Sequence, residues 1–137
     1  MKIATWLCLI SLLILVTACR KDQRKVNRIE GKWSVVYAEL PNFGKIEPDL
    51  IFKFDWCKVR FDDYCDFSVY DFKLDSLRLG IYNVSKNGNS LTLSFEDSGY
   101  SSFEVFSIER LNFRTLILEN TNAQSMYYSK FRLRSID

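Results

Sequence analysis

Side chains that carry most protein catalysis are scarce in this chain of 137 residues. It contains no histidine, so neither a Ser-His-Asp nor a Cys-His arrangement can form. Its five glycines make no phosphate-binding or dinucleotide-binding pattern. The remaining candidates are the carboxylates of Asp62, Asp63 and Asp66, which could bind a cation or transfer protons but lack the spacing of a calcium loop. We therefore expect a protein that is not an enzyme and that uses no metal or cofactor.

Four cysteines are the other reactive side chains, and two of them lie close to the N-terminus. Cys8 is inside an apolar run at residues 6–16, which follows a single positive charge on Lys2. Cys19 comes after two small residues that end this apolar segment. A charged start, an apolar core of about 7–15 residues and small residues at the cut are typical of a secretory signal, and a membrane span needs about 20 apolar residues. Residues 1–18 are thus predicted to be a cleaved signal peptide.

The stretch Val16-Thr17-Ala18-Cys19 resembles the lipobox of bacterial lipoproteins. In that family the signal is cut just before the cysteine, which is lipidated and becomes the new N-terminus. The resemblance implies a lipid anchor on Cys19, with palmitate among its acyl chains. It also implies a place in the cell envelope, at the outer membrane and facing the periplasm, with surface exposure left open.

Charge divides the predicted mature chain into two parts. Residues 19–28 carry five basic side chains against one acidic side chain, a net charge of +4. We expect them to form a basic tether that favours anionic lipid, or alternatively a plain flexible spacer. Residues 29–137 hold 13 Lys and Arg against 16 Asp and Glu, a net charge of −3. One mildly acidic domain of this size is not expected to bind nucleic acid.

Cys57 and Cys65 remain once the N-terminal pair is set aside. An even pair of cysteines in an exported domain most often forms a disulfide, which is our prediction. Two free thiols are the first alternative. A metal site is the second, although two thiolates eight residues apart are only half of a zinc site.

Short stretches of alternating polar and apolar residues follow one another from residue 31 onward, without a sustained helical period. Eight strands are predicted, at residues 33–40, 50–59, 64–74, 77–84, 90–96, 103–111, 115–119 and 126–134. Asn87-Gly88 between two of them indicates a tight hairpin turn. This pattern predicts an all-β, antiparallel barrel, with a β-sandwich as the alternative.

Gly31-Lys32-Trp33 at the first predicted strand resembles the Gly-x-Trp opening of lipocalins. The whole chain is similar to lipocalin-like lipoproteins of the Bacteroidota type, with residues 29–137 as the barrel domain. In lipocalins the tryptophan packs at the closed end of the barrel beneath an arginine of the last strand. The resemblance therefore implies that Trp33 packs at a barrel end against Arg132 or Arg134, through a cation–π contact.

Two further features bear on function. Eight aromatic side chains crowd into residues 52–72, and they indicate either a Phe-rich core, which we favour, or an exposed ligand or partner surface. Asp75-Ser76-Leu77 resembles the O-glycosylation motif of exported Bacteroidota proteins, so Ser76 is a candidate for modification. We expect a membrane-anchored barrel that binds a small apolar ligand or an envelope protein, or alternatively an accessory subunit of an envelope assembly without a ligand cavity.

Overall fold

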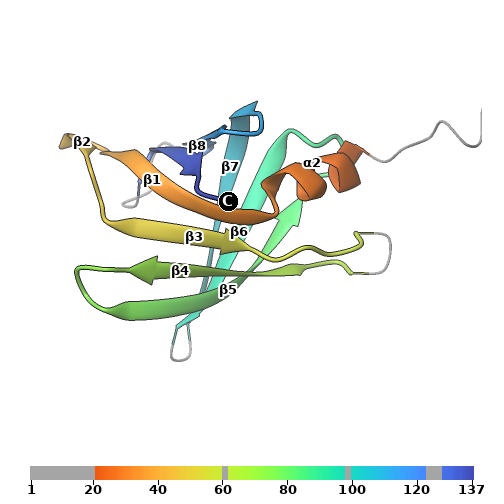
Figure 1. Cartoon of the computed structure of the whole chain (residues 1–137), viewed down its shortest axis with the longest axis horizontal. Coiled ribbons are helices and arrows are strands. Elements are labelled where there is room, and N and C mark those ends of the chain that lie inside the picture. Colours follow the sequence, from red (N-terminus) through yellow and green to blue (C-terminus); the bar gives the residue numbers. More distant parts are fainter. Residues whose placement is uncertain (1–20, 60–61, 98–99, 123–127) are drawn as a thin grey trace, which may run out of the picture.

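The computed structural model describes residues 21–59, 62–97, 100–122 and 128–137. These residues form one short helix and nine strands, drawn in chain order in Figure 1. The elements are α2 (Lys21–Ile29), β1 (Gly31–Leu40), β2 (Gly44–Ile46), β3 (Leu50–Phe54), β4 (Cys65–Asp71), β5 (Ser76–Val84), β6 (Ser90–Asp97), β7 (Tyr100–Leu111), β8 (Thr115–Asn120) and β9 (Lys130–Ser135).

Eight of the strands form a closed antiparallel barrel. Consecutive strands from β3 to β9 pair as hairpins, β1 pairs with β3, and β9 returns to pair with β1. The short strand β2 adds to the far end of β1 as a ninth strand outside the closed ring. The predicted antiparallel barrel is thus confirmed, and the alternative of a sandwich is not what the chain adopts.

Alternation of side chains decides which face of each strand looks inward. In β9, Phe131 and Leu133 are buried while Arg132 and Arg134 are exposed. Successive side chains of a strand point to opposite faces, so the apolar set lines the interior of the barrel. The predicted turn at Asn87-Gly88 is also present, with a φ of 73° at Gly88 that favours glycine.

One glycine is required by packing rather than by a turn. Gly80 lies opposite Phe67 in the β4–β5 pair, and its φ lies outside the left-handed range. A Cβ atom on residue 80 would lie 2.5 Å from the Phe67 ring and 2.4 Å from the carbonyl oxygen of Ser94. The absent side chain therefore lets the Phe67 ring lie directly over strand β5.

Helix α2 packs across one end of the barrel, beside the connection from β5 to β6 (Figure 1). Val26 and Ile29 on one side of the helix have no exposed surface and belong to the same core as the strands. The described domain thus includes residues 21–28, within the segment for which a tether was expected. Within this basic helix, Val26 and Ile29 are three residues apart, which is the spacing of one helix face.

Candidate functional site

The two ends of the barrel differ in how they are filled. At the end covered by α2, the interior holds Trp33, Tyr82, Phe54 and Leu91, each at most 2% exposed. The indole Nε1 of Trp33 donates a hydrogen bond to the carbonyl oxygen of Ile29 at 2.7 Å. This is the closed end, because the helix and the indole together fill it.

A disulfide fixes the connection from β3 to β4 at the closed end. Cys57 and Cys65 are bonded, with their Cα atoms 5.7 Å apart, which confirms the predicted pair. The side chain of Gln23 in α2 joins this connection to the helix: its Nε2 donates to the carbonyl oxygen of Cys57 and its Oε1 accepts from the backbone N–H of Val59, both at 3.0 Å. Helix, disulfide and connection therefore act as one cover.

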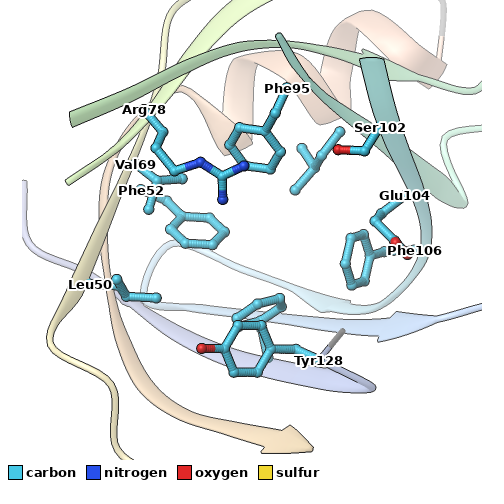
Figure 2. Close-up of a pocket in the computed structure, with 11 residues that line it drawn as sticks. Leu50, Phe52, Val69, Arg78, Phe95, Ser102, Glu104, Phe106 and Tyr128 are labelled. Carbon is cyan, nitrogen blue, oxygen red and sulfur yellow. The ribbon is translucent and has the colours of Figure 1, made fainter. Parts of the chain in front are cut away.

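At the opposite end, which we call the open end, the barrel interior contains a hollow of about 110 Å³. Figure 2 shows aromatic and aliphatic side chains around it, with the polar side chains of Arg78, Ser102 and Glu104 among them. Aromatic rings form most of its wall; the centroid of Phe131 lies 5.4 Å from that of Phe52 and 4.9 Å from that of Tyr128. The residues that line the hollow are Leu50, Phe52, Val69, Arg78, Leu93, Phe95, Ser102, Glu104, Phe106, Tyr128 and Phe131.

Two charged side chains lie at this hollow, on opposite sides in Figure 2. Arg78 stands opposite Val69 in the β4–β5 pair, an inward register, and its guanidinium lies 4.1 Å from the centroid of the Phe95 ring. Glu104 on β7 accepts a hydrogen bond from Nδ2 of Asn120 at 2.6 Å. A molecule in the hollow would thus meet a mostly apolar wall that also carries one positive and one negative side chain.

The volume of the hollow limits what could enter it. Sites for drug-sized molecules occupy about 300–1,000 Å³, while a dry cavity of about 150 Å³ lined by apolar side chains can hold benzene. At about 110 Å³ the hollow matches a single small ring or the end of a hydrocarbon chain. The rest of a larger ligand would lie outside the barrel mouth.

Trp33 and the two arginines of the last strand lie on different faces of the barrel wall. Trp33 is 2% exposed and faces inward, opposite Ser135. Arg134 pairs with Ser34 and Arg132 with Tyr37, and both arginines are exposed on the outer face. The indole N–H of Trp33 at the closed end bonds to the carbonyl oxygen of Ile29, and both arginines lie on the opposite face of the barrel wall.

Other residues singled out in the sequence are spread over the molecule. Cys19 and the predicted signal peptide at residues 1–18 lie outside the described residues. Ser76 is half-buried at the start of β5, opposite Asp71. Of the crowded aromatic residues, the structure buries Phe52, Phe54 and Phe67 in the core, in line with the favoured Phe-rich core, and leaves Trp56, Tyr64 and Phe72 at least half exposed; Phe61 is outside the described residues.

The carboxylates of Asp62, Asp63 and Asp66 are all exposed. Asp62 and Asp63 lie in the β3–β4 connection, and Asp66 lies on the outer face of β4 opposite Ile81. Within the described ranges, no group of three or more His, Cys, Asp or Glu side chains is placed to hold a metal ion. Among the helical residues that the structure describes, none belongs to a helix long and apolar enough to span a bilayer.

Sequence reasoning did not single out Arg78, Ser102 or Glu104, which line the hollow. The inward position of Arg78 could have been predicted from a β4–β5 hairpin, because residue 78 then lies opposite the inward Val69.

Comparison with known proteins finds no matching family model, no similar curated protein and no similar solved structure.

Proposed function

We propose that this protein is a lipid-anchored, lipocalin-like barrel of the bacterial cell envelope that binds the end of a slender apolar group in its open end. The anchor is a lipid on Cys19, after removal of residues 1–18. The observation that supports binding is the aromatic hollow of about 110 Å³ at one end of a barrel whose other end is filled. An apolar group placed against these aromatic walls would gain free energy by burying its apolar surface.

The test uses benzene and 1-hexanol as probes and the chain from Lys21 onward. Val69 and Leu93 line the hollow, and their methyl NMR signals should shift on titration. The methyl signals of Val26 and Leu116, in the remaining core, should stay unchanged. Absence of selective shifts at Val69 and Leu93 would count against binding in the hollow.

A matched pair of substitutions separates the hollow from the outside of the barrel. Ser102 lines the hollow, whereas Ser94 faces outward opposite the exposed Phe103. Ser102→Phe should fill the hollow and abolish the shifts. Ser94→Phe adds the same ring on the outer face and should leave them intact. Equal responses of the two variants would contradict the proposal.

A second candidate function has its own observation. Leu77 and Leu79 of β5 are 60% and 67% exposed, and Phe103 of β7 is 69% exposed, all on the outer face. Outward positions of an antiparallel sheet are usually polar, so these exposed apolar side chains are candidates for contact with a partner. The alternative is an accessory subunit that binds an envelope protein through this outer face.

Photo-crosslinking in native membranes tests this alternative. A photoreactive side chain at Leu79 should give a discrete crosslinked product. The same group at Lys53, on the outer face of β3 in an ion pair with Asp55, is the control. If the two positions give the same products, the outer face of β5 has no dedicated partner.

A further inference from the structure

We infer that the closed end of the barrel rests on an anionic bilayer with helix α2 toward the lipid, so that the open end points away from the membrane. The inference rests on the lipid anchor at Cys19 in the proposed function. It adds the orientation of the barrel and the surface that contacts the headgroups.

The chain between the anchor and the domain is very short. Only residue 20 separates Cys19 from the first residue of α2. Consecutive Cα atoms are about 3.8 Å apart, so the Cα atoms of Cys19 and Lys21 are at most about 7.6 Å apart. Because α2 is fixed to the core by Val26 and Ile29 and to the β3–β4 connection by Gln23, it offers no slack. The closed end must then stay near the lipid.

The exposed surface of the helix is basic. Lys21, Arg24 and Arg28 are exposed on α2, spaced by three and four residues and thus on one side of the helix. The only acidic side chain of the helix, Asp22, is 3% exposed. Each basic residue near an anionic surface strengthens binding roughly fivefold. The domain as a whole has no such excess, since residues 29–137 carry a net charge of −3.

Exposed aromatic side chains lie at the same end. Trp56 is 51% exposed, and its Nε1 donates to Oδ1 of Asn27 at 2.8 Å, so the indole lies beside the outer side of α2. Phe113, in the turn between β7 and β8, is 90% exposed. Tryptophan is enriched where proteins meet the headgroup region.

The acidic side chains of Asp62 and Asp63 also lie at the closed end, beside Asp22 and Lys86. We therefore expect the membrane contact under α2 rather than under the whole closed end.

Two phenylalanines make a matched pair for measuring orientation. Phe113 is 90% exposed at the closed end, and Phe43 is 83% exposed in the turn between β1 and β2 at the open end. The full chain, lipidated in cells and with its disulfide intact, would carry a single bimane label on Phe113→Cys or Phe43→Cys. Vesicles of phosphatidylcholine with phosphatidylglycerol would contain lipids with a nitroxide on the headgroup. We expect strong quenching at position 113 and little at position 43, because strand β1, ten residues and about 30 Å long, runs from one end of the barrel to the other.

Charge is tested with a second matched pair. The double variant R24Q/R28Q removes two charges from α2, and R132Q/R134Q removes two from the outer face of β9. The first should lower the quenching ratio between positions 113 and 43 on phosphatidylglycerol vesicles, and the second should not. Equal quenching at both positions in a protein that sediments with vesicles would overturn the orientation while the anchor stands. If the wild-type chain fails to sediment, or a Cys19→Ser chain sediments equally well, the anchor fails and the orientation falls with it.

Discussion

The indole nitrogen of Trp33 lies 2.7 Å from the carbonyl oxygen of Ile29, and this hydrogen bond joins the first strand to the last residue of helix α2. The final carbonyls of a helix have no partner within the helix, so one of them is satisfied here by a buried side chain. Gly31 lies between the two residues with a φ of 118°, which glycine adopts readily. The contact explains how nine helical residues can close a barrel end.

Replacing Trp33 with phenylalanine should therefore destabilise the domain. The change removes the indole N–H, leaves the buried Ile29 carbonyl without a donor and creates a gap in the core. The unsatisfied carbonyl alone costs about 1–3 kcal/mol, and the lost volume adds to it. We expect the free energy of unfolding in urea, followed by circular dichroism, to fall by about 2–4 kcal/mol.

Trp56→Phe is the control for this experiment. Trp56 also donates a hydrogen bond from its indole, to Asn27, but it is 51% exposed and water can replace the bond. We expect a loss below about 1 kcal/mol. Equal losses in the two variants would show that the closed end does not depend on the Trp33 contact.

Helix α2 itself is expected to contribute to stability. Ile29 is fully buried, so Ile29→Ala should lower the free energy of unfolding by about 2–5 kcal/mol. Arg28→Ala, one residue earlier and exposed, should change it by no more than about 0.5 kcal/mol. Urea unfolding of both variants makes the comparison. A helix that merely lies on the surface would give two small changes.

The sequence predicts the barrel because alternation is a local signal that needs no knowledge of partners. Phe131 and Leu133 alternate with Arg132 and Arg134, and the structure keeps this division. Local patterns do not reveal tertiary contacts in the same way. Val26 and Ile29 stand among five basic residues, so their burial depends on a barrel end that only the complete fold creates.

For the candidate site as well, local features could be predicted from the sequence and tertiary contacts could not. Cys57 and Cys65 could be paired from their number and spacing, since a disulfide needs only two available thiols close together. The hollow could not be located, because its wall comes from six different strands and from Tyr128. Arg78 gains its inward position from the register of β5 against β4, which single strands do not specify.

Removal of the disulfide should weaken the cover of the closed end. Closing a loop with a sequence separation of eight residues restricts the unfolded chain by about 2–3 kcal/mol, so C57A/C65A should lose about that much stability. Reduction of the wild-type chain should have a similar effect on the urea midpoint. The oxidised chain from Lys21 onward should show no free thiol. An unchanged midpoint after reduction would contradict a stabilising role.

Alkaline pH should destabilise the domain through Tyr82. Its side chain has no exposed surface and donates to the carbonyl oxygen of Asp55 at 2.6 Å. Burial, together with the negative charges of Glu30 and Asp55, raises the pKa of Tyr82 well above its ordinary value of 10. Because the folded state holds this proton more tightly than the unfolded state, the stability is fully present below about pH 10 and is lost as the pH rises toward the folded pKa.

The expected slope above pH 10 is up to about 1.4 kcal/mol per pH unit from this one group. Tyr82→Phe should be less stable at neutral pH by about 1 kcal/mol, since it lacks the hydrogen bond, and its stability should fall less steeply above pH 10. Tyr64→Phe, at an exposed position, should keep the wild-type slope. Urea unfolding from pH 8 to 11 measures all three chains, and the comparison isolates residue 82 because each variant differs from the wild type at a single side chain. If Tyr82→Phe kept the full slope, the alkaline sensitivity would belong to other groups, and the buried phenol would contribute to stability only through packing and its hydrogen bond.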